Sequence, residues 1–256
     1  MRILSAGTDS NGSFTTCDIR RANKIPGSSS SPIYRRDHLH TLLDELSATP
    51  LIVLNARSGS GKTTFMADYA ARHPSSCIWY CATHGADVGS ILHGLVASAS
   101  ESHLLQNQHE IFWALQEADA TNLATLRHFF STFLKKIPAP LLIVIDNFQQ
   151  VQFEDAFHDV LCAACQGLPK GGHIVIVNSG TCYLNLQHLR KAFPVAVLEN
   201  QDFKLNAKEV AEIAKLYGRS LTSPIEARRL LATVEGCASC LIGILSDERP
   251  LTAGSF

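Results

Sequence analysis

The sequence predicts an α/β protein in which a parallel sheet carries helices on both faces and is followed by a small unit made of helices only. Short runs that are apolar throughout alternate with segments of helical periodicity, which is typical of strands buried on both faces of a parallel sheet. After residue 204 the pattern contains helices alone. With 256 residues, 46% of them hydrophobic, the chain is long enough to bury one large core or two smaller ones.

The composition argues against several classes of protein. Lys and Arg number 22 and Asp and Glu number 23, so the formal net charge is −1, whereas a nucleic-acid-binding chain usually has a basic excess. The hydrophobic fraction is too high for disorder throughout. No apolar run approaches the roughly 18 residues of a membrane span, and the N-terminus lacks the apolar centre of a secretory signal. We therefore expect a cytoplasmic protein that does not itself bind nucleic acid or a membrane.

The expected elements follow one another along the chain. Residues 1–30 are rich in Ser, Thr, Gly and Asn and carry no hydrophobic period, so we expect a flexible arm there. Apolar runs predict strands at residues 51–54, 77–80, 141–145, 173–177 and 195–198. Apolar residues at helical spacing predict helices at residues 37–46, 62–72, 88–101, 121–136, 155–168, 207–217, 224–235 and 238–246. We therefore divide the chain into an arm (1–30), a sheet domain (31–204) and a helical subdomain (205–256).

A glycine-rich loop between the first strand and its helix has the form of a phosphate-binding loop. It reads Ala56-Arg-Ser-Gly-Ser-Gly-Lys-Thr63 and is called the phosphate loop below. Gly59 and Gly61 let the backbone turn its N–H groups inward. The helix that begins at Lys62 points its positive end at the same anion. Lys62 would bridge the terminal phosphates, and the Thr63 hydroxyl would bind Mg²⁺.

The third expected strand supplies a second nucleotide-binding signature. Its apolar run ends in Asp146, where a carboxylate would hold Mg²⁺ through water. The fourth strand ends in Asn178-Ser179, where a polar side chain could contact a γ-phosphate, and we name Ser179 as the candidate. Ala56 stands where the loop motif has its first glycine. Alanine is the mildest replacement there, so we still expect phosphate binding.

Two pairs of cysteines have the C-x-x-C spacing, Cys162/Cys165 and Cys237/Cys240. A structural zinc site needs four ligands that converge on one point, and the two pairs lie far apart in sequence, each in an apolar stretch with helical character. Residues three apart share one face of a helix. We therefore interpret both pairs as small hydrophobic residues that face the core rather than as metal ligands.

Together the motifs resemble the nucleotide-binding module of the STAND ATPases, specifically that of MalT-like, LuxR-associated transcriptional regulators. Many families share the phosphate loop, so the specificity comes from the end of the second strand and from the helical tail. The segments that carry the resemblance are Pro32–Arg36, Ser58–Thr64, Trp79-Tyr80, Leu142–Asp146, Glu209–Ala211, Ser223–Ala227 and Val234–Gly236. The resemblance implies a P-loop NTPase fold of the ASCE/AAA-like class with a helical lid, which uses bound ATP or ADP with Mg²⁺ as a switch for self-association and signalling.

The resemblance also implies roles for individual residues. The phosphates would contact Ser58, Gly59, Ser60, Gly61, Lys62, Thr63 and Thr64. Lys62 and Asp146 would be the catalytic residues, while Thr63 and Asp146 would hold Mg²⁺. The adenine would be bound by residues from two segments, namely Ile33, Tyr34, Arg36 and Pro224.

The sequence departs from the family pattern at three of these motifs. Asn147 stands where the family usually has a second acid. An amide cannot take a proton from attacking water, so a general-base contribution of about 10²–10⁴ would be missing. Gly180 replaces an arginine after Ser179, which removes a positive charge that could read the γ-phosphate. Cys237 replaces the tryptophan that usually follows the glycine of the last motif.

Three functions are compatible with this pattern. The first is a nucleotide-dependent switch with slow or absent hydrolysis, which signals to another regulatory protein or to copies of itself. The second is a working ATPase or small-molecule kinase. The third is an interaction scaffold that has kept the fold and lost the nucleotide; a weaker idea is a secreted effector whose arm acts as an export signal. We favour the first because a nearly intact binding motif lies beside altered catalytic positions.

Overall fold

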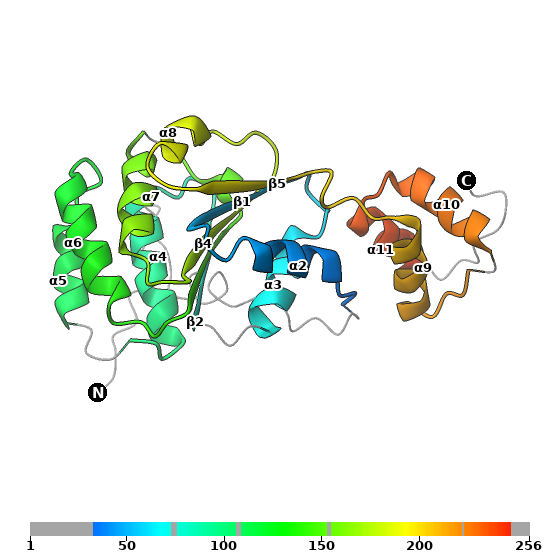
Figure 1. Cartoon of the computed structure of the whole chain (residues 1–256), viewed down its shortest axis with the longest axis horizontal. Helices are drawn as coiled ribbons and strands as arrows, with labels where there is room; N and C mark the ends of the chain where they lie inside the picture. Colours follow the sequence, from blue (N-terminus) through cyan, green and yellow to red (C-terminus); the bar gives the residue numbers. More distant parts are fainter. Residues whose placement is uncertain (1–32, 73–75, 106–108, 153–154, 222, 247–256) are drawn as a thin grey trace, which may run out of the picture.

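The computed structural model describes residues 33–72, 76–105, 109–152, 155–221 and 223–246 (Figure 1). The expected flexible arm at residues 1–30 and the last part of the expected helical subdomain, residues 247–256, lie outside the described residues.

A five-stranded parallel sheet with the order β2-β3-β4-β1-β5 forms the centre of the molecule. Its strands are β1 (Leu51–Asn55), β2 (Ser76–Cys81), β3 (Leu141–Asp146), β4 (His173–Asn178) and β5 (Val195–Glu199). All five expected strands are therefore confirmed. The register pairs Asn55 with Asn178 and Cys81 with Asp146. The carboxyl ends of β1 to β4 consequently meet at one edge of the sheet and bring polar residues together there.

Helices cover both faces of this sheet, as expected (Figure 1). One face packs against α2 (Asp37–Glu45) and α3 (Lys62–Arg72). The opposite face packs against α4 (Val88–Glu101), α5 (His109–Glu117), α6 (Leu123–Leu134), α7 (Ala156–Gly167) and α8 (Leu186–Arg190). Successive residues of a strand serve the two faces in turn: Leu51 and Val53 join the larger core, whereas Ile52 and Leu54 join the smaller one.

Two of these helices were not predicted from the sequence. In α5 the side chains of Phe112 and Trp113 are exposed. These large apolar residues outside the core interrupt the helical spacing of apolar residues by which an amphipathic helix is predicted. Helix α8 has 5 residues, too few to establish a period. A short 3-10 helix, η1 (Phe148–Gln150), follows β3.

The helical subdomain, described here for residues 205–246, has a core of its own. Its helices are α9 (Ala207–Leu216), α10 (Pro224–Val234) and α11 (Ala238–Ser246), and all three were expected. Val210, Leu230 and Leu241 are buried where these helices meet. A capping box of Asn206 and Glu209 begins α9. In Figure 1 this subdomain lies at the far end of the molecule, beyond α2 and α3.

Within the described residues, no single helix is long and apolar enough to span a membrane. Helices α10 and α11 reach the required length and hydropathy only when counted together, and they meet at an angle of 116°.

Candidate nucleotide-binding site

The phosphate loop connects β1 to α3 and adopts a backbone that favours glycine. Gly59 has a φ of +77° and Gly61 a φ of +90°, both in the left-handed region that residues with a Cβ rarely adopt. Helix α3 begins at Lys62 and has no acidic residue in its first turn. The positive end of the helix therefore faces the loop without a competing carboxylate from its own first turn.

Lys62 folds back across the loop. Its side chain is buried, and its ammonium donates to the carbonyl oxygens of Ala56 at 2.7 Å and Arg57 at 2.8 Å, and to Ser60 Oγ at 3.3 Å. Burial lowers the pKa of Lys62, and the carboxylate of Asp146 opposes this shift. A phosphate in the loop would offer the ammonium an anionic partner, and charge-assisted hydrogen bonds are stronger than those to neutral carbonyls.

The two predicted magnesium ligands meet in the structure. Thr63 Oγ1 donates to Asp146 Oδ1 at 3.1 Å, and the backbone N–H of Asn147 donates to the same oxygen at 2.8 Å. Asp146 is 2% exposed. Burial raises the pKa of its carboxyl, although these two hydrogen bonds and Lys62 act in the opposite direction. A hydroxyl and a carboxylate are the oxygen donors that Mg²⁺ accepts, so the residues present fit this ion.

The polar side chain next to the loop strand belongs to Asn178 rather than to the predicted Ser179. Asn178 is buried, and its Nδ2 donates to Asn55 Oδ1 at 2.8 Å, across the registered pair of β4 and β1. Ser179 is half-buried one residue further on, where its backbone N–H donates to Gln149 Oε1 at 3.1 Å. The strand end itself, more than the residue after it, therefore faces the loop. Asn178 belongs to the polar pair Asn178-Ser179 that ends the expected fourth strand, so the sequence does mark this position.

Asn147 occupies the position of the expected second acid, and its side-chain amide points toward β2. Asn147 adopts a left-handed backbone with a φ of 56°, and its Nδ2 donates to Cys81 Sγ at 3.0 Å. Asp87, an acidic residue between β2 and α4, accepts from the backbone and side chain of Ser90 and caps α4. Neither residue offers a general base beside Asp146.

A cavity of about 80 Å³ lies on the other side of the loop. The sheet domain contributes the predicted residues Ile33, Tyr34, Arg36 and Thr64, together with Ser60, Gly61, Phe65 and Asp68. The helical subdomain contributes Leu205, Ile213, Tyr217, Ala238 and Ile242. The structure thus gathers the predicted adenine residues of the N-terminal segment, the phosphate loop and the helical subdomain around one cavity.

Arg36 has a structural role in this wall that the sequence did not predict. Its Nε donates to Glu209 Oε1 at 3.0 Å, and its other two nitrogens donate to the carbonyl oxygens of Phe203 at 3.0 Å and Lys204 at 3.1 Å. Arg36 and Glu209 are both buried. The guanidinium therefore ties the N-terminal segment to α9 and to the linker that leads into it.

Pro224, predicted to close over the base, lies elsewhere. It is exposed at the first position of α10 and lines neither cavity beside the loop. Proline suits that position because its fixed φ starts a helix, and Ser223 caps the same helix by accepting from Glu226 N at 3.3 Å. The turn that begins α11 takes the place next to the loop instead.

This turn touches the phosphate loop directly. The backbone N–H of Ser239 donates to the carbonyl oxygen of Gly59 at 2.9 Å. A Cβ at Gly59 would lie 2.0 Å from Ser239 Oγ, so this close approach requires glycine as much as the backbone angle does. Upstream, Gly236 packs against the linker, where a Cβ would lie 3.1 Å from Lys204 Cβ.

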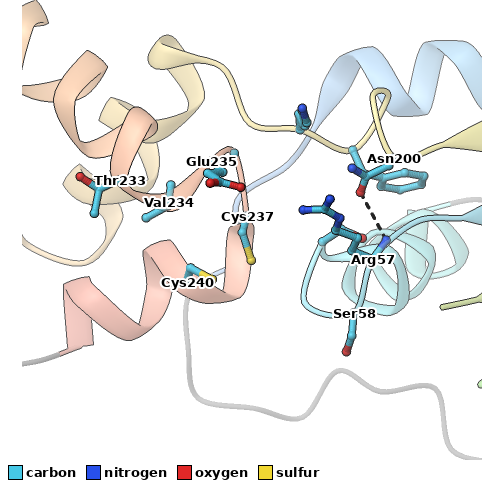
Figure 2. Close-up of a pocket in the computed structure, with 12 residues that line it drawn as sticks. Arg57, Ser58, Asn200, Thr233, Val234, Glu235, Cys237 and Cys240 are labelled. Atoms are coloured by element: carbon cyan, nitrogen blue, oxygen red, sulfur yellow. Dashed lines mark hydrogen bonds between the residues drawn. The ribbon is translucent and has the colours of Figure 1, made fainter. Parts of the chain in front are cut away.

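Figure 2 shows a second cavity, of about 260 Å³, between the loop and this turn. The residues that line it include Arg57, Ser58 and Ser60 of the loop, Asn200, Phe203 and Lys204 of the linker, and Thr233, Val234, Glu235, Gly236, Cys237 and Cys240 of the helical subdomain. The backbone N–H of Arg57 donates to Asn200 Oδ1 at 3.3 Å, drawn as the dashed line.

The two cysteine pairs differ from one another. Cys162 and Cys165 are buried on α7, which confirms the interpretation as core residues. For Cys237 and Cys240 that interpretation is wrong, since Cys237 is half-buried, Cys240 is exposed, and both line the cavity beside the loop. The described residues contain no group of three or more metal-ligating side chains.

Residues 32–177 match the family model of the AAA ATPase domain. The chain belongs to the AAA ATPase domain family. Membership of this family implies nucleotide binding at the phosphate loop. The parallel sheet and the loop geometry described above agree with this assignment.

The chain is also similar to regulator proteins that are longer than itself. Over 228 residues it is 25% identical to the HTH-type transcriptional regulator MalT of Yersinia pestis (strain Pestoides F), an alignment that covers 84% of this chain and 24% of the regulator. The MalT regulator of Yersinia pseudotuberculosis (strain YPIII) matches equally well. The chain therefore spans about a quarter of the length of the curated relatives it matches, and the predicted resemblance to the MalT-like module is confirmed.

Solved structures show the same fold. A STAND protein with a tetratricopeptide repeat sensor from Pyrococcus horikoshii superposes with a TM-score of 0.60 at 19% identity, covering 88% of this chain and 32% of that one. A Walker-type ATPase of Pyrococcus abyssi gives a TM-score of 0.54 at 12% identity, covering 86% of this chain and 69% of that one. The predicted P-loop NTPase fold of the AAA-like class is thus confirmed.

Proposed function

We propose that this chain is the ATP- and ADP-binding switch module of a signal-transducing regulator, with slow or absent hydrolysis. The observation that carries the proposal is the position of the phosphate loop between two structural units. On the side of the sheet, Thr63 at the end of the loop contacts Asp146, and Lys62 lies beside it. On the side of the helical subdomain, the Gly59 carbonyl accepts a hydrogen bond from Ser239. Nucleotide in the loop would therefore act on both units at once.

Binding of the phosphates would use groups of this chain that are already close together. Lys62 would exchange its hydrogen bonds to loop carbonyls for the β- and γ-phosphate oxygens. Thr63 and Asp146 would hold Mg²⁺, which neutralises phosphate charge when it is bound. The base would enter the smaller cavity beside Tyr34, whose volume of about 80 Å³ requires the helical subdomain to shift outward.

Slow or absent hydrolysis follows from the residue after Asp146. Asn147 cannot accept a proton from water at neutral pH, and its amide is bound to Cys81. Asp146 itself would be occupied by the metal. The chain therefore binds and holds nucleotide more readily than it turns it over.

The signalling role is proposed from the relatives. The matched MalT proteins are named as HTH-type transcriptional regulators, and this chain spans about a quarter of their length. With a formal net charge of −1 over its 256 residues, the chain is better suited to contact another regulatory protein or a second copy of itself than DNA. We place this role in the cytoplasm.

The first test is calorimetric titration with ATP and with ADP in the presence of Mg²⁺. We expect micromolar or tighter binding, about −8 kcal/mol, that is lost in Lys62→Ala. Lys170→Ala is the matched control, because Lys170 is an exposed lysine in the turn between α7 and β4. Absence of binding to a folded wild-type chain would instead support the interaction scaffold.

Hydrolysis is tested by single-turnover phosphate release. We expect a rate near background for the wild type and an increase in Asn147→Asp, since aspartate tolerates the left-handed backbone and restores a base, with a gain of up to about 10²-fold. Rapid turnover by the wild type that disappears in Asp146→Ala would identify a working ATPase and contradict the switch with slow hydrolysis.

A further inference from the structure

Cys237 and Cys240 are placed at the start of a helix and at the edge of a cavity. Cys237 immediately precedes α11, and its carbonyl accepts the hydrogen bond of Leu241 N at 3.1 Å, the first of that helix. Cys240 lies in the first turn. Both thiols are free and both are open to solvent, Cys240 more than Cys237. In Figure 2 the sulfur of Cys237 points toward the gap that separates α11 from the loop.

Cys237 also contacts the phosphate loop. Its Sγ donates to the Gly59 carbonyl oxygen at 3.8 Å and lies 3.4 Å from Ser239 Oγ. The same Gly59 oxygen accepts from the Ser239 backbone N–H at 2.9 Å. Two adjacent groups of the helical subdomain thus hold one carbonyl of the loop, and one of the two is a thiol.

The surroundings of Cys237 favour its thiolate. Burial by itself raises the pKa of Cys237, but hydrogen bonds from Cys240 and Ser239, through side chains and backbone N–H groups, outweigh burial and lower it. The same interaction raises the pKa of Cys240. The cavity wall adds the cations Arg57 and Lys204 and one acid, Glu235. A thiolate at a helix N-terminus beside a second thiol is the arrangement of reactive C-x-x-C cysteines.

The other described cysteines lack this environment. Burial raises the pKa of Cys77 to about 12, and it also raises the pKa values of the remaining cysteines, Cys81, Cys162, Cys165 and Cys182. The pair at Cys162 and Cys165 has the same spacing but faces the core. Among the described residues, Cys237 is therefore the thiol best prepared to react.

We propose that Cys237 and Cys240 form a redox-active dithiol whose oxidation to a disulfide weakens the contact between the helical subdomain and the phosphate loop. The oxidant is a low-molecular-weight disulfide. The Cys237 thiolate attacks one of its sulfurs, forms a mixed disulfide and expels one thiolate. Cys240 then loses its proton and attacks the Cys237 sulfur, which expels the second thiolate. The dithiol loses two hydrogens, and the oxidant is reduced to two thiols.

Forming this bond requires the Cβ atoms of Cys237 and Cys240 to approach each other. Residues three apart on a helix have Cβ atoms about 5–6 Å apart, whereas a disulfide needs about 3.5–4.5 Å. Cys237 lies just outside the helix and can turn toward Cys240 without breaking the helix. The disulfide also removes the S–H group that donates to the Gly59 carbonyl. The Ser239 N–H then remains as the hydrogen bond from the helical subdomain to the Gly59 carbonyl.

The first experiment measures thiol oxidation in the whole chain. A Cys17→Ser background is used because Cys17 lies outside the described residues. The folded protein is equilibrated with mixtures of reduced and oxidised glutathione, alkylated with N-ethylmaleimide and mapped by mass spectrometry. We expect an internal disulfide at Cys237–Cys240 while Cys162 and Cys165 stay reduced, and a mixed disulfide with glutathione at Cys237 in Cys240→Ser. Reduced Cys237 and Cys240 in oxidised glutathione alone would overturn the proposal.

The second experiment measures the contact itself by hydrogen exchange and does not need nucleotide. We expect the Ser239 amide to exchange about 2- to 10-fold faster in the oxidised chain, as for loss of one modest hydrogen bond. A Cys237→Ala, Cys240→Ala double variant should show no change when oxidant is added. If the Ser239 amide of the wild type exchanged at the same rate in both redox states, the proposed weakening of this contact would be overturned.

A third measurement connects the dithiol to nucleotide binding, and this link rests on the proposed function. Calorimetry should show ATP binding that is about 2- to 10-fold weaker in the oxidised chain, because the loop loses its support from α11. If the reduced chain binds no nucleotide, the proposed function fails, while thiol mapping and hydrogen exchange still decide the dithiol. Equal ATP affinity in both redox states would overturn its coupling to the site.

Discussion

The sheet domain and the helical subdomain meet at the phosphate loop but hold it in different ways. The sheet domain contributes two buried charged side chains, Lys62 after β1 and Asp146 at the end of β3, on either side of β4. The helical subdomain contributes a backbone N–H and a thiol to the carbonyl of Gly59. Strands in register give the first set a rigid frame, whereas the second set can separate without disturbing the sheet. The proposed nucleotide binding and the proposed switching therefore use different sides of one loop.

The largest effect is expected from breaking the link between the two regions at Arg36. Arg36→Met leaves Glu209 buried without its cationic partner, and removal of one member of such a pair costs about 3–5 kcal/mol. Denaturant titration should show that the free energy of unfolding falls by this amount. Arg35→Met is the matched control. The ion pair of Arg35 Nε with Asp37 Oδ1, 2.5 Å apart, is exposed to solvent and should contribute less than about 1 kcal/mol. Similar losses in both variants would contradict a special role for Arg36.

The next largest effect concerns the metal side of the loop. Thr63→Val removes the hydroxyl that meets Asp146, and we expect ATP affinity in Mg²⁺ to fall by at least about 10- to 100-fold, the loss typical of even an outer partner of a metal site. Affinity in EDTA should change little, since the hydroxyl acts through the ion. Calorimetry with and without Mg²⁺ separates the two cases. Equal losses in both buffers would mean that Thr63 supports the loop rather than the metal.

A smaller effect should separate the two glycines of the loop. Gly59→Ala and Gly61→Ala both place a Cβ in the left-handed region, at a cost of about 1–2 kcal/mol each. Only at Gly59 does the Cβ meet Ser239, at 2.0 Å, whereas at Gly61 the nearest atom is Ala238 Cβ at 3.7 Å. Hydrogen exchange should therefore show faster exchange of α11 in Gly59→Ala than in Gly61→Ala. The same exchange in both variants would argue against a close contact at Gly59.

The smallest effect concerns the pH dependence of stability on the sheet side. Burial raises the pKa of Asp146, so the fold favours its protonated form. The stability that protonated Asp146 gives to the fold is fully present below the unfolded pKa of about 3.9. It is lost as the pH rises through the higher pKa of the folded state. Asp146→Asn should therefore raise the free energy of unfolding at pH 7 and have little effect at pH 3, while it weakens Mg²⁺-dependent binding. A destabilised Asp146→Asn at pH 7 would contradict this direction.

Much of the site could be predicted because its signals are local. A run of apolar residues that ends in Asp146 and a glycine-rich loop before Lys62 both lie within a few residues of sequence. Parallel strands place such loop and strand ends at one edge, so the meeting of Thr63 with Asp146 follows from the fold class. The prediction for Ser179 remains untested, and the structure adds Asn178 one residue earlier, since the ends of strands are uncertain by a residue or two in a sequence prediction.

The lid was harder to predict in detail. Its three helices follow from apolar periodicity, but periodicity does not say which helix start faces the loop. The resemblance implied that Pro224 at the start of α10 binds the base, whereas in the structure Cys237 and Ser239 at the start of α11 contact the phosphate loop. The C-x-x-C spacing likewise could not distinguish a buried pair from an exposed one.

The sequence by itself determined the succession of strands and main helices along the chain, the phosphate loop and the residues that end the strands beside it. These features depend on local periodicity, on glycine and on the positions of charges, all of which can be recognised in short segments. Only the tertiary structure decided that Arg36 is bound by Glu209, that Gly59 is held by Ser239, and that one cysteine pair lies in the core while the other borders the site. Such contacts join segments far apart in the chain, and their geometry depends on how the two units pack against each other.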